Sequence, residues 1–424
     1  MIAEQKIADQ ERVTSLKPWP IVSRVPAVDP SDLMSARIAI VDPVWTHYRY
    51  PVYSELAQHC RVDWIFSPAQ RTAGYGSVTP PPTSSLRYIE TPMRNPAGQT
   101  IGFWQAGVTR YLIHERPDAV MFSANPRSIS FWMALVAGRI LGIPVYAHGH
   151  GMVRRTRISW LYRQMMNLLL RLAAGYVAYS PLVRDTFAAH GFSVSKVEVA
   201  HNSMINPCPL SPSEKTGCER GVLFLGRLRL DSGMEALLGA AQRLREGGCD
   251  IELHIVGAGE ARRRLQQTCA ASNWVHWYGE VYDPARIREI SQACFAGCHP
   301  GAAGLSVVHM MSLSLPVLVQ NRLEHHGPEV AMVRDWNNGV RYGAGQPATG
   351  IDEALAAMLR DAPRLRQMQN AAYSSYLDLI DPSLATRLGR ILLKQLPGPA
   401  FVKFRDAALV QTPPPDQRSD IAAE

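Results

Sequence analysis

The chain has 424 residues, of which 46% are hydrophobic and 19% charged, and its formal net charge is +8 at pH 7. This composition excludes a fibrous or mainly disordered chain, and the length is too great for one compact core, so we expect two domains. A basic surface attracts phosphates, nucleic acid or anionic lipid, but the excess is modest and we expect no nucleic-acid partner.

Seven cysteines, odd in number and scattered, are typical of a reduced, cytoplasmic chain rather than a disulfide framework. Cys294, Cys298 and His299 lie close in sequence, but no second ligand pair stands at a familiar spacing, so burial explains them better than a metal site. The first 30 residues do not resemble a signal peptide. The longest apolar run, residues 129–138, is too short to span a bilayer, so any membrane contact is expected to be peripheral.

Residues 1–32 are expected to form a flexible arm, and strand and helix patterns then alternate through residues 33–206. Strands are predicted at 37–42, 62–66, 118–122, 144–147, 175–179 and 197–200, and helices at 50–60, 102–115, 128–141, 157–173 and 181–189. Residues 69–100, rich in Pro, Gly, Ser and Thr, are interpreted as a long functional loop. This alternation predicts a doubly wound parallel sheet in a Rossmann-like domain.

The polar, proline-containing residues 207–219 are the predicted linker, and residues 220–375 a second Rossmann-like domain. Its strands are predicted at 221–225, 251–256, 274–278, 294–299 and 316–319. An amphipathic C-terminal helix over 376–396 and a disordered tail over 397–424 complete the chain. Ligands of such sheets bind beyond the carboxyl ends of the strands, so two facing halves predict an α/β enzyme with a central cleft.

The loop after the strand at 221–225 reads Gly-Arg-Leu-Arg-Leu-Asp-Ser-Gly and leads into a helix. Glycines let a ligand approach the backbone, and the helix N-terminus offers free N–H groups. Because Arg227 and Arg229 add full charges, the loop predicts a diphosphate seat; the alternative is a plain tight turn with surface arginines. The next strand ends in Gly257 and Gly259, a GxG pattern that is weak evidence alone. The turn before Val281 can line a nucleobase pocket.

A third glycine-bearing loop, HPGAAGLS, begins at His299 and also feeds a helix. Taken in order over about residues 221–339, the motifs GRL…G, VGxG, YGEV, HPG…GLS…PV and HGPE…NNG resemble the C-terminal domain of the retaining GT-B glycosyltransferases of family 4, the glycosyl transferases group 1. The first half resembles the family more loosely, through HGHG and His201-Asn202-Ser203. The resemblance implies a GT-B fold, with the nucleotide-sugar donor in the C-terminal domain and the acceptor in the N-terminal one.

Two features depart from the family pattern. The family's two glutamates, eight positions apart, are Gly301 and His309 here, and Ser232 stands where a lysine normally follows the arginine at Arg227. We interpret PG…GL…H as a variant of the loop. Gly301 can offer only backbone N–H groups, His309 can still hydrogen-bond a ribose, and Arg229 can replace the missing lysine charge.

By resemblance, the donor is expected to contact a set of residues from these loops: Arg227, Arg229, Ser232, Gly257, Gly259, Val281, Gly301, Gly304, Leu305, His309 and Glu329. His150 is expected beside the reacting centre, the alternative being that it satisfies buried backbone groups. His47, Arg49 and His148 are expected on the acceptor side or elsewhere in the cleft.

A basic, amphipathic helix pattern begins after the HGHG segment. Arg154, Arg155 and Arg157 precede Trp160 in it, and such helices dock onto anionic lipid. The alternative is an ordinary helix that covers the sheet with its arginines in water. Peripheral contact with the inner face of the plasma membrane would suit a lipid-linked acceptor.

The resemblance implies transfer of a sugar from a nucleoside diphosphate to an acceptor hydroxyl, with retention, in bacterial surface or exopolysaccharide synthesis. Arg227 and the helix N-termini would stabilise the leaving diphosphate, so no metal and no other cofactor is expected. If the enzyme inverts, His150 is the candidate base. Two alternatives stay open: a catalytically silent nucleotide-sugar-binding partner, which Gly301 favours, and a GT-B sugar-nucleotide epimerase, which needs carboxylates in the cleft.

Overall fold

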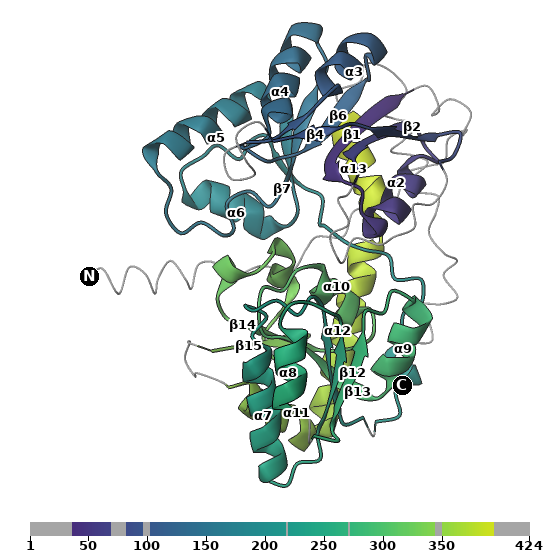
Figure 1. Ribbon diagram of the computed structural model, residues 1–424, viewed down its shortest axis with the longest axis vertical. Coiled ribbons are helices and arrows are strands. Elements are labelled where there is room, and N and C mark those ends of the chain that lie inside the picture. Colours follow the sequence, from purple (N-terminus) through teal and green to yellow (C-terminus); the bar gives the residue numbers. More distant parts are fainter. Residues whose placement is uncertain are drawn as a thin grey trace.

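The computed structural model describes residues 36–68, 82–95, 102–217, 219–269, 272–343 and 350–393, which fold into two α/β bodies. The bodies lie one above the other in Figure 1. The predicted arm, residues 1–32, and the predicted tail, residues 397–424, lie outside the described residues. Among the helices described, none has the length and apolar character that crossing a membrane requires.

The first body is built on a seven-stranded sheet in the order β3-β2-β1-β6-β7-β8-β9, in which all neighbours pair in parallel. Its strands are β1 (Arg37–Val44), β2 (Arg61–Ser67), β3 (Leu86–Glu90), β6 (Ala119–Ser123), β7 (Val145–Gly149), β8 (Gly175–Ala178) and β9 (Val197–Val199). Both faces of the sheet are buried, which explains the near-continuous apolar runs of these strands.

Helices cover both faces of this sheet. The helices are η2 (His47–Arg49), α2 (Tyr50–Leu56), α3 (Val108–Glu115), α4 (Ile129–Leu141), α5 (Trp160–Leu172) and α6 (Pro181–Ala189), and β4 (Met93–Arg94) pairs with β5 (Trp104–Gln105) beside them. Serine caps start two of the helices, because the Oγ atoms of Ser128 and Ser159 accept the N–H groups of Phe131 and Tyr162. Helices α3 to α6 pack on one face, and α2 packs on the other.

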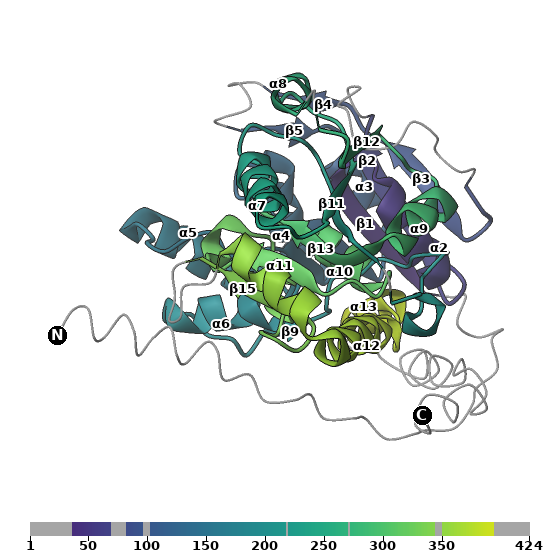
Figure 2. The same ribbon diagram turned by 90° about the horizontal axis from the view of Figure 1, so that it is seen from below.

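The second body has a six-stranded parallel sheet in the order β12-β11-β10-β13-β14-β15. Its strands are β10 (Gly221–Leu225), β11 (Glu252–Val256), β12 (Val275–Gly279), β13 (Cys294–His299), β14 (Val317–Gln320) and β15 (Gly339–Tyr342). Its helices are η3 (Pro212–Glu214), α7 (Met234–Glu246), α8 (Arg262–Thr268), α9 (Pro284–Gln292), α10 (Leu305–Met311), η4 (Leu323–His325), η5 (Pro328–Met332), α11 (Ile351–Arg360) and α12 (Ala362–Ile380). Figure 2 shows α7 and α11 on one side of the sheet and α9 on the other.

The long loop predicted over residues 69–100 is wrong in part, because β3 and β4 lie inside it. Strand β3 adds to the edge of the sheet beside β2. Leu86 is buried there, and the guanidinium of Arg87 donates two 2.8 Å hydrogen bonds to the carboxylate of Asp63 on β2. These contacts lie far apart in sequence, which is why the local composition gave no sign of them.

The C-terminal helix predicted over 376–396 is two helices. Helix α12 ends at Ile380, Pro382 follows, and α13 (Leu384–Leu393) then begins. Proline lacks a backbone N–H, and Ser383 Oγ accepts the N–H of Thr386 at the start of the new helix. Apolar residues of α13, including Leu388, join the core of the first body. Figure 1 shows α13, in yellow, beside α2.

Over residues 36–393, the range that the structure describes with gaps, the chain therefore crosses between the bodies at two places. The first crossing precedes Asn206, which is already fixed to the second body: its N–H donates to the hydroxyl of Tyr376 at 3.0 Å. This crossing lies before the predicted linker, residues 207–219. The second crossing lies between α12 and α13, and Arg387 joins the two by donating to the carbonyls of Ala200 at 2.6 Å and Leu379 at 2.7 Å.

Candidate active site

A cleft of about 690 Å³ lies between the bodies and is lined by loops at the carboxyl ends of both sheets. Of the predicted site residues, the lining includes Arg227, Arg229, Ser232, Gly257, Val281, Gly304, Leu305, His309 and Glu329 from the second body, and His47, Arg49 and His150 from the first. Gly259 and Gly301 are not part of the lining, and His148 lines a smaller cavity beside it.

The arginine loop, residues 226–232, forms one wall. It is held against the end of β11, because the N–H of Leu228 donates to the carbonyl of Ala258 at 3.0 Å. Gly257 has φ +145°, and a Cβ there would overlap the carbonyl oxygen of Gly226; at Gly259 the same atom would overlap the carbonyl oxygen of Leu228. The two glycines thus let the backbones approach closely and position the loop.

Gly301 lies directly behind the same loop. A Cβ at this position would lie 2.6 Å from the carbonyl oxygen of Asp231 and 2.7 Å from that of Ser232. A glutamate therefore does not fit at residue 301 while the arginine loop keeps its place. The departure from the family pattern is a packing requirement of this chain, and Gly301 supports the donor wall from outside the lining.

Two buried polar atoms of the donor wall have no hydrogen-bond partner among the described residues. They are Oγ of Ser232, which precedes the N-terminus of α7, and Nδ1 of His299 at the end of β13. A buried polar atom without a partner costs about 1–3 kcal/mol, so the Oγ of Ser232 favours a polar ligand in the cleft. Burial, aided by His326, lowers the pKa of His299 to about 4, so its imidazole is neutral.

His309 and His47 lie near one another across the cleft. Burial lowers the pKa of His309 to about 4, with a smaller contribution from His47. The ring of His47 also meets the ring of Tyr282 edge-on, with centroids 5.9 Å apart. His309 is therefore a neutral imidazole that can donate or accept one hydrogen bond, and Tyr282 closes the cleft beside it.

Glu329 is buried at the point where the bodies touch. Its Oε1 accepts a 2.5 Å hydrogen bond from Nδ2 of Asn202, which follows β9 in the first body. Burial raises the pKa of Glu329, and the hydrogen bond from Asn202 opposes that rise. A second bond joins the bodies nearby, since Nε of Arg154 donates to the carbonyl of His326 at 3.2 Å.

An aromatic cluster forms the first body's wall. The ring of Tyr179 lies 4.5 Å from the ring of His148 and 4.6 Å from that of His150, and Cζ of Arg49 lies 5.4 Å from it. Burial lowers the pKa of His148 well below its ordinary value, with Arg49 adding to the effect. The ring of His150 is open to the cleft, yet the surrounding protein, Arg154 and Arg49 lower its pKa to about 4.

A side cavity of about 240 Å³ extends from the cleft into the first body, and His148, His150 and Arg49 line it. Its floor is Asp42, whose carboxylate accepts from Ser123 Oγ at 2.6 Å and from Trp64 Nε1 at 3.0 Å. Nη1 of the buried Arg49 has no hydrogen-bond partner among the described residues. The cavity therefore offers a fixed cation to an anionic or hydroxyl-bearing ligand.

Both halves of the chain match families of known proteins. Residues 52–204 match the family described as Glycosyltransferase Family 4, and residues 219–361 match Glycosyl transferases group 1. The structure of Anabaena HepE (Alr3699) in complex with UDP-glucose superposes with a TM-score of 0.58 at 17% identity, over 84% of this chain and 98% of that one. The chain belongs to the GT-B glycosyltransferases. The family and fold expected from the ordered motifs are thereby confirmed.

Other similar proteins point to the same fold for this glycosyltransferase. The lipopolysaccharide outer core galactosyltransferase WaaB superposes with a TM-score of 0.59 at 14% identity, over 85% of this chain and 100% of that one. The pneumococcal O-GlcNAc transferase GtfA superposes with a TM-score of 0.61 at 10% identity, over 86% of this chain and 99% of that one. The phosphatidyl-myo-inositol mannosyltransferase of Mycobacterium leprae is 24% identical over 262 residues, which are 60% of this chain and 67% of that protein.

Two residues that line the GT-B cleft, Asn202 and His299, and a third beside it, His326, were not among the predicted site residues. Asn202 was noted only as part of a motif, and His299 only as a rejected metal ligand and as the first residue of a glycine-bearing loop. His326 is fully buried, and its Nδ1 accepts the N–H of Ala303 at 3.1 Å while Nε2 donates to the carbonyl of Gln320 at 2.7 Å. It thereby fixes the loop that carries Gly304. The sequence held no signal for these roles, since each depends on a partner distant in sequence.

The basic segment before α5 is divided between two places in this glycosyltransferase. Arg154 is exposed to solvent at the cleft, which it lines. Arg155 lies over the ring of Tyr162, with Cζ 4.2 Å from the centroid, and Arg157 and Trp160 are exposed. Of the four residues predicted to contact a membrane, three therefore remain on the outside of the first body.

Proposed function

We propose that this glycosyltransferase moves a hexosyl group from a nucleoside diphosphate to an acceptor hydroxyl, with the donor diphosphate seated on the arginine loop. The observation that carries the proposal is the donor wall: Arg227, Arg229 and the unpartnered Ser232 Oγ face one cleft at the N-terminus of the 13-residue helix α7. Anabaena HepE structures hold UDP-glucose or UDP, which makes UDP-glucose the first donor to test.

The chemistry follows from charge. As the glycosidic bond breaks, negative charge grows on the leaving diphosphate, and fixed cations and backbone N–H groups stabilise it without reorganising. Arg227 and Arg229 supply the cations that a lysine at residue 232 would otherwise share. In this proposal the transfer step needs no metal ion, and His309 contacts the ribose as a neutral hydrogen-bonding partner.

His150 is proposed to contact the transferred sugar as a neutral imidazole. Its pKa, lowered to about 4 by burial and by Arg154 and Arg49, makes it a weak base at neutral pH. An inverting reaction needs a base with a pKa nearer the working pH, so this favours retention of configuration at the transferred carbon. Determination of the product anomer by NMR tests this directly: a retained α-linkage supports the proposal and an inverted one contradicts it.

The acceptor is proposed to enter from the first body, past Arg49 and the side cavity. Two similar proteins are a phosphatidyl-myo-inositol mannosyltransferase and a lipopolysaccharide outer core galactosyltransferase. Their names support a lipid-linked glycan as the acceptor, in bacterial surface or exopolysaccharide synthesis. The free Nη1 of Arg49 would then bind a phosphate or a sugar hydroxyl of that acceptor.

Peripheral membrane contact at the inner face of the plasma membrane would deliver such an acceptor. Large apolar side chains are exposed at the start of helix α5: Trp160 is 73% exposed and Leu161 71%. Arg155 and Arg157 lie close in sequence to the start of α5. Apolar residues beside cations suit the interface of an anionic bilayer, and we propose that this surface docks there.

The donor site is tested by binding and turnover with UDP-, GDP- and dTDP-sugars. Arg227→Ala is expected to lower kcat/KM by about 10²- to 10³-fold. Arg263→Ala, an exposed arginine of α8 outside the cleft, is the matched control and should change little. If Arg227→Ala binds the donor as tightly as the wild type does, the proposal that the arginine loop binds the diphosphate is contradicted. Donor binding without any turnover identifies a silent binding partner instead, and conversion of the donor without an acceptor identifies an epimerase.

A further inference from the structure

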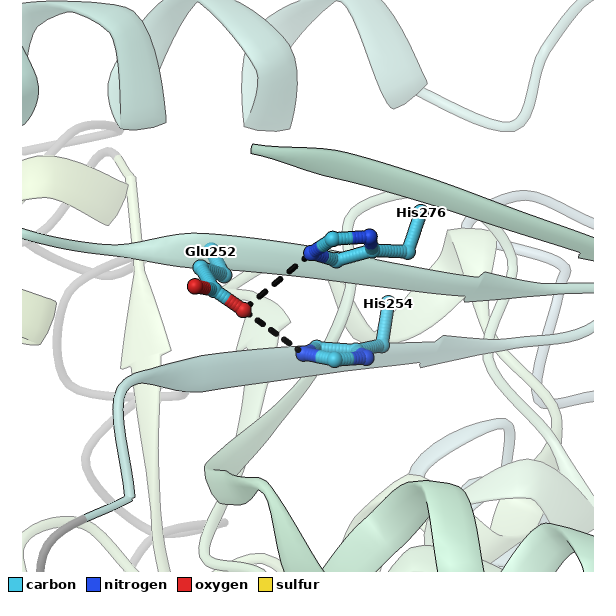
Figure 3. A group of neighbouring side chains, drawn as sticks. All are labelled: Glu252, His254 and His276. Carbon is cyan, nitrogen blue, oxygen red and sulfur yellow. Dashed lines mark hydrogen bonds and ion pairs between the residues drawn. The ribbon is translucent and has the colours of Figure 1, made fainter. Parts of the chain in front are cut away.

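Two histidines and a glutamate gather on one face of the second sheet, at the edge formed by β12. Glu252 and His254 are two residues apart on β11, so their side chains share a face. His276 on β12 is the direct partner of His254 across the strand pair. Figure 3 shows the three side chains pointing toward one another. The rest of the chain's proposed chemistry does not use them.

The spacing of these groups suits a metal ion. Oε2 of Glu252 lies 3.1 Å from Nε2 of His276 and 3.5 Å from Nε2 of His254, and the three ligand atoms all lie within 4.8 Å of one another. A tetrahedral zinc site with bonds of about 2.0–2.1 Å places its ligand atoms about 3.3 Å apart. The two measured separations bracket that value, and the two histidine nitrogens lie within 4.8 Å of each other, so the three ligand atoms can close on one ion by side-chain movement.

The histidine nitrogens also point the correct way. Nδ1 of His254 lies 2.9 Å from the hydroxyl of Tyr278, and Nε2 faces Oε2 of Glu252 at 3.5 Å, which is longer than an ordinary hydrogen bond. When Nδ1–H donates to the tyrosine, Nε2 carries a lone pair directed at Glu252. In that tautomer the lone pair of Nε2 and the carboxylate of Glu252 repel each other. A cation bound between them removes this repulsion.

The neighbouring strand leaves room for this arrangement. Gly221 on β10 lies against His254, and a Cβ there would be 2.8 Å from Nε2. Glu252 and His276 are 38% and 37% exposed, so an ion can enter from solvent and a water molecule can complete its coordination.

We propose that Glu252, His254 and His276 bind one divalent transition-metal ion of the zinc class, held by Oε2 and the two Nε2 atoms. The ion fastens the edge strand β12 to β11. Glu252 is four residues from Val256, the residue of β11 that lines the cleft, a distance of about 13 Å along the strand. The ion therefore stabilises the second body and takes no part in sugar transfer.

The test uses untagged, full-length protein that has been treated with a chelator and then titrated with Co²⁺ and Zn²⁺. One Co²⁺ per chain is expected, with the intense visible absorption of tetrahedral Co²⁺ that Zn²⁺ abolishes by competition, and Zn²⁺ is expected to raise the unfolding temperature. His276→Gln and Glu252→Gln should each weaken binding at least tenfold and remove the thermal shift. Tyr278→Phe, which removes only the partner of Nδ1, should weaken it about 10-fold.

His114→Gln, at an exposed histidine of α3, is the control and should bind as the wild type does. Circular dichroism verifies that each variant is folded, and the half-exposed positions of Glu252 and His276 favour that. Absence of stoichiometric uptake by folded wild-type protein overturns the proposal. The proposal is also overturned if both His276→Gln and Glu252→Gln bind the metal ion with the affinity of the wild type, because the ion would then be bound elsewhere. Donor turnover is measured in a separate assay. The metal-binding result can therefore be interpreted even if the protein transfers no sugar.

Discussion

Asn202 and Glu329 join the two bodies of the molecule at the floor of the cleft, through a 2.5 Å hydrogen bond from Nδ2 to Oε1. Both side chains are buried, and each comes from a different body. Glu329 lies at the donor wall, and Asn202 follows the last strand of the first sheet. The bond therefore links the relative position of the bodies to the protonation of one carboxyl group.

Asn202→Ala is expected to make stability depend more steeply on pH. Burial raises the pKa of Glu329, so the folded state binds the proton more tightly than the unfolded state. The stability from this group is full below the unfolded pKa and is lost as pH rises through the raised folded pKa. Without Asn202 that pKa rises further, and the variant should lose about 1–3 kcal/mol at neutral pH and less in acid. Urea unfolding across pH measures this.

The matched background for this experiment is the Glu329→Gln variant, which has no titrating carboxyl at the contact. Asn202→Ala in that background should show a cost that does not vary with pH. If the pH dependence persists when Asn202→Ala is combined with Glu329→Gln, another group is responsible and the assignment to Glu329 is wrong.

Substitution of Gly301 is expected to damage donor binding rather than restore the family's glutamate. A Cβ there would lie 2.6 Å from the carbonyl oxygen of Asp231, so the arginine loop has to move. Both Gly301→Ala and Gly301→Glu should raise the donor KM about 10-fold or more, because a displacement of about 1 Å is costly in a positioned site. Gly239→Ala inside α7, where a Cβ meets only a flexible arginine, is the control. Improved turnover in Gly301→Glu would contradict this packing argument.

The sequence predicted most of what depends on local pattern. The apolar strands at 221–225 and 294–299 appear at those residues, and the glycine loops that follow the strands do meet at one cleft. The periodicity of buried parallel strands and the turn residues carry that information. The family motifs added the order of the loops, and hence the donor side.

Features that depend on distant partners escaped the sequence analysis. Arg154 resembles a surface cation until His326, 172 residues away, is known to accept its hydrogen bond. Gly301 resembles a lost catalytic residue until the carbonyl of Asp231 is found against it. The return of α13 to the first body depends on a packing partner, α2, at the other end of the chain. The local pattern of residues in a sequence does not indicate such pairings between distant residues.

Arg387 is expected to control how the two bodies are held together. Its guanidinium donates to the carbonyl of Ala200, just after β9, and to that of Leu379 in the last turn of α12, and burial lowers its pKa to about 10. Arg387→Ala leaves these carbonyls without a donor and should cost about 2–4 kcal/mol of unfolding free energy. Arg387→Lys should recover only part, because an ammonium cannot reproduce the planar fork. Arg360→Ala, at a surface position of α11, is the control, and equal stability of all three variants would contradict the role.

The activity of the wild type is expected to show no inflection between about pH 6 and 8 that arises from His150. Its pKa is lowered to about 4, so the ring stays neutral over that range and kcat/KM should fall only as the pH approaches 4. His150→Gln should keep more activity than His150→Ala, since the amide still forms hydrogen bonds. An inflection near neutral pH that disappears in His150→Gln would instead identify a general base and an inverting reaction.

Trp160 and Leu161 at the start of α5 are expected to decide whether the protein binds membranes. Both are highly exposed, at 73% and 71%, and burying a large apolar side chain in a bilayer interface contributes about 1.5–3 kcal/mol. The double variant Trp160→Ser and Leu161→Ser should therefore lower binding to vesicles rich in anionic lipid at least tenfold in sedimentation assays. Turnover with a soluble acceptor should not change, because neither residue lines the cleft.

The control for the membrane experiment is Leu377→Ser, at an exposed leucine of α12 on the second body. High salt should weaken the binding of the wild type to anionic vesicles, because Arg155 and Arg157 contribute through charge, while the contribution of Trp160 and Leu161 should persist. Equal vesicle binding by the double variant and the wild type would mean that α5 is an ordinary surface helix. The acceptor would then have to reach the cleft without help from this face of the first body.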